Sequence, residues 1–113
     1  MAARELVDQV YVAEKIENYI VDLVMATRNP EAYGLKLKEL IQFGGSPRAT
    51  INLTLAAKAN AFLAGRGYVV PQDVKDLALD VLRHGVVITY EAEAEDRTSA
   101  SIVTEILNHI PVP

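Results

Sequence analysis

The chain has 113 residues, half of them hydrophobic and 23% charged, and its formal net charge is −4. This length and composition predict a single globular domain, and the acidic balance argues against a nucleic-acid partner, because proteins that bind phosphate backbones usually carry a basic face. The lack of cysteine, of a signal peptide and of any apolar run near the ~18 residues that span a bilayer predicts a cytoplasmic protein without membrane insertion.

The first expected helix is marked by apolar residues at positions i, i+4, i+7, i+8, i+11 and i+12. These residues are Val12, Ile16, Tyr19, Ile20, Leu23 and Val24. Asn29 and Pro30 should end the helix, because proline pushes the residue before it out of the α region. Residues 31–43 fit both strand and helix patterns, so we expect a loop with a short element there.

The start of a second helix is marked by Ser46 and Pro47, with Ser46 as N-cap and Pro47 in the first turn. This helix should run to about Ala64, and its many alanines favour helix and allow neighbours to approach closely. Its expected core face consists of Ile51, Leu55, Ala59 and Phe62. The Gly-Arg-Gly segment 65–67 is too short for a phosphate loop and follows a helix, so it is interpreted as a helix stop.

A brief extended segment at residues 68–70 should precede a third helix, which Pro71 opens and Gly85 caps. Its apolar stripe consists of Val74, Leu77, Ala78, Val81 and Leu82. Residues 86–90 are mostly β-branched or aromatic and predict a short strand.

The acidic residues 91–96 predict a solvated loop or a frayed helix. Thr98 should cap a last helix with core positions Ile102, Val103, Ile106 and Leu107. The predicted fold class is therefore mainly α, a small helical bundle with a minor short extended element.

The motifs of a self-sufficient enzyme are missing. The chain has no glycine-rich loop followed by lysine and Ser/Thr, the pattern that cradles phosphates and magnesium. His84 and His109 lack the spacing of metal ligands, and no Ser/His/Asp grouping stands out. We therefore expect no catalytic residue and no metal site within this chain.

Arg48 stands out because it falls in the first turn of the second expected helix. An exposed cation there opposes the helix dipole at a cost of about 0.3–1 kcal/mol. The same helix start offers backbone N–H groups to an anion, and a guanidinium beside them can bind phosphate oxygens in a bidentate manner. Two interpretations stay open: an anion site, or an arginine that reaches towards solvent or a neighbouring acid.

Residues 44–50 (GGSPRAT), followed by the alanine-rich residues 55–59, resemble the sensor 2 helix of MoxR-family AAA+ ATPases. Further segments resemble the family in the same order along most of the chain, namely residues 19–21 and 26–28, 65–69, 71–74, 81–84 and 106–113. Two departures are Gly85, where the family usually has a basic residue, and Val70, where a capping threonine is expected.

The resemblance implies that residues 1–113 form one helical lid domain, detached from an upstream AAA+ nucleotide-binding core. The core would bind ATP and magnesium, so the full-length parent would be an ATPase whereas this chain alone would not be an enzyme. The lid would close over ATP and supply Arg48 as the sensor 2 arginine; Ser46 and Arg28 are weaker nucleotide-binding candidates.

The partners that the resemblance implies are the lid's own AAA+ core, neighbouring subunits of a ring, and client proteins that the chaperone-like machine remodels or matures. An alternative is a non-catalytic helical protein-interaction module unrelated to an ATPase. Such a module would share the helical pattern but gives no reason for the Ser46-Pro47-Arg48 sequence. A helix-turn-helix DNA binder is disfavoured by the acidic balance.

Overall fold

The computed structural model describes residues 9–113, which fold mainly into helices. The four long helices are α2 (Glu14–Arg28), α3 (Pro47–Leu63), α4 (Pro71–Arg83) and α6 (Ser99–His109). The shorter elements are the 3-10 helix η1 (Pro30–Tyr33), the strands β1 (Ile41–Phe43) and β2 (Val87–Ile88), and the helix α5 (Tyr90–Ala94). The predicted mainly α bundle is confirmed.

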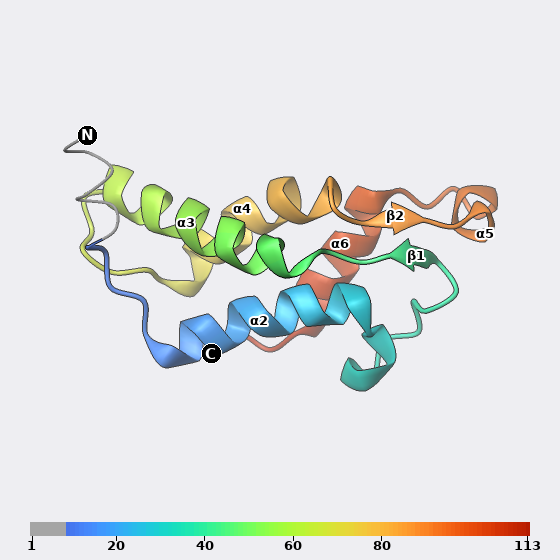
Figure 1. Ribbon diagram of the computed structural model, residues 1–113, viewed down its shortest axis with the longest axis horizontal. Coiled ribbons are helices and arrows are strands. Elements are labelled where there is room, and N and C mark those ends of the chain that lie inside the picture. The colour runs from blue at the N-terminus through green and yellow to red at the C-terminus, as the bar shows by residue number, and fades with distance from the viewer. Residues whose placement is uncertain (1–8) are drawn as a thin grey trace.

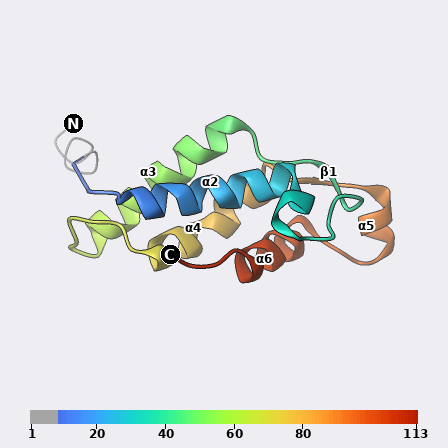
Figure 2. The same ribbon diagram turned by 90° about the horizontal axis from the view of Figure 1, so that it is seen from below.

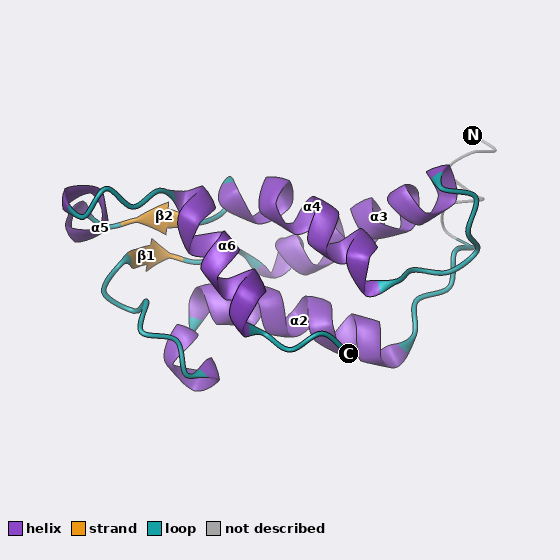
Figure 3. Ribbon diagram, turned by 180° about the vertical axis from the view of Figure 1, so that it is seen from behind, coloured by secondary structure: helices purple, strands orange, loops and turns teal. Residues whose placement is uncertain are grey.

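The long helices pack as a layered bundle. Helices α3 and α4 run antiparallel and share the largest contact, and α2 lies against α3 (Figure 1). Helix α6 crosses α4 and α2 on the side away from α3 (Figure 3). The strands and α5 project beyond the long helices at one end (Figures 1 and 2). No helix within residues 9–113 is long and apolar enough to cross a bilayer.

A single hydrophobic core joins the faces of all four long helices. The predicted stripe of α2 is buried, with Val12 half-buried just before the helix, and α4 buries Val74, Ala78 and Leu82 while Leu77 and Val81 are half-buried. Helix α6 buries Ile102, Val103 and Ile106 and is capped by the Thr98 side chain, which accepts from Ser101 N at 3.0 Å. For these three helices the apolar periodicity identified the core face correctly.

The predicted core face of α3 is wrong. Its buried residues are Ala49, Leu53, Ala57 and Ala61, whereas Ile51 is 61% exposed and Leu55 is 43% exposed. Apolar side chains lie on several sides of this helix, so periodicity alone does not select one face. The alanine face is buried because small side chains allow α4 to approach closely. Helix α3 therefore turns larger apolar residues towards solvent.

The extended elements are shorter than predicted. Strands β1 and β2 pair antiparallel, with Ile41 opposite Ile88 and Phe43 opposite Val87. The strand predicted at residues 86–90 ends after two residues because Thr89 caps α5, accepting a hydrogen bond from Ala92 N at 3.2 Å. The acidic stretch that follows begins as a helix, one of its two predicted states.

The segment that leads into α2 is tied to the turn between α3 and α4. Tyr11 forms an isolated parallel bridge with Tyr68. The Tyr11 amide donates to Gly67 O and the Val69 amide donates to Tyr11 O, each at 2.9 Å. The extended character predicted for residues 68–70 is thus used to anchor the chain before its first described helix.

Buried Asp73 links the end of α3 to the start of α4. Its carboxylate accepts hydrogen bonds from Val70 N at 2.9 Å and Asn60 Nδ2 at 2.8 Å, and it pairs with Arg66. Val70 has no capping side chain, but Asp73 reaches back to its amide as the third helical residue of a capping box does. Helix α3 ends at Leu63, so residues 65–67 follow its end as the predicted helix stop requires. Arg66 among them has Asp73 as its ion-pair partner.

The turns after α3 and α4 differ. Gly65 adopts the left-handed conformation with φ of +79° as the chain leaves α3. Gly85 directly follows the C-cap His84, where the helix cap was predicted, but its φ is not positive. The Gly85 amide donates to Leu82 O at 3.0 Å.

Candidate functional site

Three segments distant in sequence meet at the start of α3. A Cβ atom added at Gly44 would lie 2.3 Å from the Thr27 carbonyl oxygen and 2.7 Å from Arg28 Cα. A Cβ added at Gly85 would lie 3.6 Å from Gly45 Cα. These contacts bring the C-terminal ends of α2 and α4 to the first turn of α3.

Thr27 stabilises this meeting point of the ends of α2 and α4 with the start of α3, which we call the arginine junction because Arg28, Arg48 and Arg83 lie on its three segments. It is 1% exposed, and its Oγ1 donates to Val24 O at 2.5 Å and accepts from Gly45 N at 2.9 Å. Both hydrogen-bonding roles of the hydroxyl are therefore used, which fixes the loop before α3 against α2. In the sequence, Thr27 falls within residues 26–28 of the family resemblance, and its role in positioning the loop before α3 was not predicted.

Arg48 lies in the first turn of α3, as predicted, and its side chain is exposed. It makes no ion pair with a carboxylate among residues 9–113. Ser46 occupies the predicted N-cap position, but its side chain makes no capping hydrogen bond. Pro47 has no amide hydrogen and the Ala49 amide donates to Ser46 O at 2.9 Å, so an anion placed at this helix start would meet the Arg48 amide and its guanidinium.

Two further arginines lie on the segments that meet here. Arg28 ends α2 and Arg83 ends α4; both are exposed, and neither forms an ion pair within the described part of the chain. Arg28 was predicted as a weaker candidate, whereas Arg83 entered the sequence analysis only within residues 81–84 of the family resemblance. Together with Arg48 they make the junction a positive region in a chain of net charge −4.

The junction provides no evident metal site. No group of three or more His, Cys, Asp or Glu side chains in residues 9–113 is placed to hold a metal ion. Three arginines lie on the segments that meet there, and arginine binds anions such as phosphate and does not ligate metals.

Arg48 shares its side of α3 with exposed apolar residues. Ile51 and Leu55 follow it at spacings of three and seven residues, which places all three on one face of the helix. We call these three residues the outer face of α3. A helix face that combines a free cation with large exposed apolar side chains is typical of a surface that another domain covers.

Replacing Gly44 with alanine is expected to destabilise the domain by about 1–3 kcal/mol, because the new methyl group would overlap rigid backbone of α2. Thermal unfolding of the 113-residue chain measures the effect. Gly67→Ala is the matched control, since a Cβ there meets nothing within 4 Å and stability should change by less than about 0.5 kcal/mol. Equal melting temperatures for the two variants would contradict the tight contact at Gly44.

Comparisons with known proteins agree with this geometry. The model of the AAA lid domain family matches residues 36–106. The chain is 37% identical over 111 residues to Chaperone MoxR1 of Mycobacterium tuberculosis, covering 97% of this chain and 29% of that protein. It is also 37% identical over 105 residues to Protein MoxR of Paracoccus denitrificans, covering 87% of this chain and 31% of that one.

A solved structure has the same fold. The crystal structure of a "putative ATPase" from Cytophaga hutchinsonii superimposes with a TM-score of 0.92 at 42% identity, covering 96% of this chain and 33% of that one. The chain therefore belongs to the AAA lid domain family, and its relatives include MoxR proteins. It spans about a third of the length of these relatives, between 29% and 33%.

Proposed function

We propose that this chain is the lid of a MoxR-type AAA+ ATPase and that it closes over ATP held by a nucleotide-binding core elsewhere in the longer protein. The observation that carries the proposal is Arg48, which forms no ion pair with a described residue and lies in the first turn of α3, directly after a loop that Thr27 and Gly44 fix against α2. An arginine whose backbone is fixed in this way, and whose side chain is not tied to a carboxylate, can extend its guanidinium to the γ-phosphate. Arg48 is the proposed sensor 2 residue, with Ser46 and Arg28 as secondary contacts.

The outer face of α3 supports the same assignment. Ile51 and Leu55 expose apolar surface beside Arg48, on the side that must approach the core if Arg48 is to reach the nucleotide. Their burial upon closure would favour the closed state through the hydrophobic effect. Nucleotide binding and domain docking would thus use one continuous surface.

In this proposal ATP and magnesium are bound by the core, and the lid contributes charge and closure. Because one core unites the long helices, the lid would move as a rigid body when ATP is hydrolysed. That movement would be transmitted to neighbouring subunits of a ring and would drive the remodelling or maturation of client proteins in the cytoplasm.

The test compares ATP turnover of the longer protein, the same protein without this lid, and the 113-residue chain alone. The chain alone is expected to release no phosphate from ATP, because it has no phosphate loop. Removing the lid is expected to lower turnover about 10²-fold or more while ATP binding persists.

Two outcomes would contradict the proposal. One is magnesium-dependent phosphate release by the purified chain that scales with its concentration and survives removal of contaminating ATPases. The other is unchanged turnover without the lid, which would favour the alternative of a helical protein-interaction module unrelated to ATP hydrolysis.

A further inference from the structure

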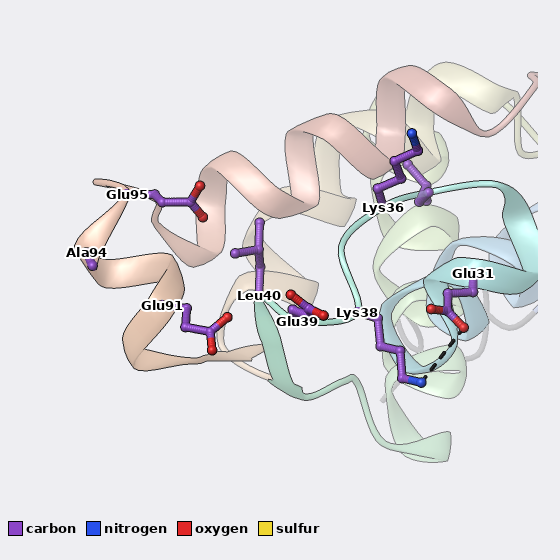
Figure 4. Close-up of a pocket in the computed structure, with 9 residues that line it drawn as sticks. Glu31, Lys36, Lys38, Glu39, Leu40, Glu91, Ala94 and Glu95 are labelled. Atoms are coloured by element: carbon purple, nitrogen blue, oxygen red, sulfur yellow. Dashed lines mark ion pairs between the residues drawn. The ribbon is translucent and has the colours of Figure 1, made fainter.

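A groove lies between α5 and residues 35–40, at the end of the molecule that projects beyond the long helices (Figure 4). Its volume is about 630 Å³, within the range of sites that hold a ligand or a few side chains. Leu35, Leu40 and Ala94 give it an apolar lining. The groove is separate from the arginine junction at the start of α3, and the ATPase role leaves it without an explanation.

Carboxylates without cationic partners line the groove. Glu91 and Glu95 lie one turn apart along the α5 segment and extend towards Leu40, beside which Glu39 lies (Figure 4). None of these three glutamates forms an ion pair with a described residue. Two lysines also line the groove: Lys38 is 3.9 Å from a Glu31 carboxylate oxygen, and Lys36 forms no ion pair with a described residue. The lining therefore carries four glutamates and two lysines.

The negative charge of the whole chain is concentrated at this end. Residues 30–43 and 87–96 contain six acidic residues and two lysines, a net charge of −4. The complete chain has 15 acidic and 11 basic residues, so the remainder carries nine of each and is neutral. A groove with a net negative charge attracts a segment of the opposite sign and raises its rate of encounter.

Apolar surface continues around the groove. Tyr90, which precedes Glu91 at the start of α5, is 90% exposed. On the adjoining sheet the cross-strand pair Phe43 and Val87 is 62% and 47% exposed. Exposed aromatic and aliphatic side chains beside unpaired carboxylates are suited to a partner that is itself both apolar and basic.

We propose that this groove binds a basic segment of a partner protein. An apolar side chain of that segment would lie between Leu40 and Ala94, and flanking lysine or arginine side chains would pair with Glu91, Glu95 and Glu39. The site acts independently of the nucleotide role proposed above. Since exposed ion pairs contribute little individually and are screened by salt, the affinity is modest and falls with ionic strength.

Binding is tested with the 113-residue chain and a fluorescein-labelled peptide, Lys-Lys-Leu-Leu-Lys-Lys, by fluorescence anisotropy at low and physiological salt. Saturable binding is expected, whereas the peptides Glu-Glu-Leu-Leu-Glu-Glu and Lys-Lys-Gly-Gly-Lys-Lys should bind at least about tenfold more weakly. Amide chemical-shift changes on peptide addition should centre on residues 35–40 and 91–95.

Matched variants locate the site. Glu91→Lys and Glu95→Lys should each raise Kd about fivefold, because each replaces an attraction by a repulsion. Glu93→Lys is the control: it makes the same charge change on α5, but Glu93 does not line the groove, so Kd should change less than about twofold. Ala94→Trp, at an exposed position, should fill the groove and abolish binding without unfolding the chain.

Several results would overturn the proposal. They are a lack of saturable binding up to about 1 mM peptide, an equal loss of affinity in Glu93→Lys, and shift changes that centre on the arginine junction. Self-association of the chain that disappears in Glu95→Lys would identify a second copy as the occupant and would also overturn it.

Discussion

Replacing Arg48 with alanine in the proposed full-length ATPase is expected to lower ATP turnover about 10²–10³-fold, equivalent to roughly 3–4 kcal/mol of barrier. The reason is that Arg48 is an exposed cation in the first turn of α3, that no carboxylate of the described residues neutralises it, and that it would stabilise charge on the γ-phosphate in the proposed closed state. Steady-state ATPase kinetics measure the loss. Lid stability should hold or rise slightly, because alanine is the best helix former and the first turn disfavours a cation.

Arg48→Lys separates charge from geometry. Lysine keeps the positive charge but lacks the planar fork, so it should restore turnover only in part. Thermal melts of both variants complete the experiment. Near-normal turnover in Arg48→Ala would remove the nucleotide-sensing role, and a large fall in its melting temperature would instead assign the side chain a structural role.

Replacing Asp73 with alanine is expected to destabilise the chain by about 3 kcal/mol, the lower end for breaking a buried ion pair, since the Arg66 side chain is 30% exposed. The substitution leaves the Val70 amide and the Arg66 guanidinium without their acceptor. This loss is a large part of the roughly 5–15 kcal/mol that stabilises a typical domain. Urea unfolding followed by circular dichroism measures it.

The matched control is Asp80→Ala. Asp80 lies on the same helix but is exposed and forms no ion pair with a described residue, so its loss should change stability by less than about 0.5 kcal/mol. If both variants unfolded at the same urea concentration, the Asp73 network would not be what joins α3 to α4.

Helices with one clearly apolar side were the predictable part of this fold. The stripes of α2 and α6 alternate with polar residues, so periodicity identified both the helix and its buried side. In α3 either the alanines or the larger Ile51 and Leu55 could form the buried face, and which face is buried depends on how closely α4 approaches. Pairing of β1 with β2 joins segments more than 40 residues apart, and local pattern carries no information about that partner.

The candidate site also has a part that the sequence predicts and a part that only the tertiary structure shows. Ser46 and Pro47 marked a helix start, so the position of Arg48 in its first turn was predictable. The bond between Thr27 and Gly45 spans 18 residues, and the approach of Gly85 to Gly45 spans 40; neither leaves a local signal. Arg83 was overlooked for this reason, because only tertiary structure brings the end of α4 to the start of α3.

The anchoring of Tyr11 to the turn between α3 and α4 has a mechanical consequence. Helix α2 is held at one end by that bridge and at the other by the hydrogen bond from Gly45 to Thr27, so it acts as a stiff bar between the two points. Its 15 residues span about 22 Å at about 1.5 Å per residue. A rotation of about 10° around Tyr11 would therefore carry the far end of the bar, beside Arg48, through about 4 Å. If the lid closes as proposed, a small turn near Tyr11 would become a displacement large enough to make or break the proposed contact of Arg48 with phosphate.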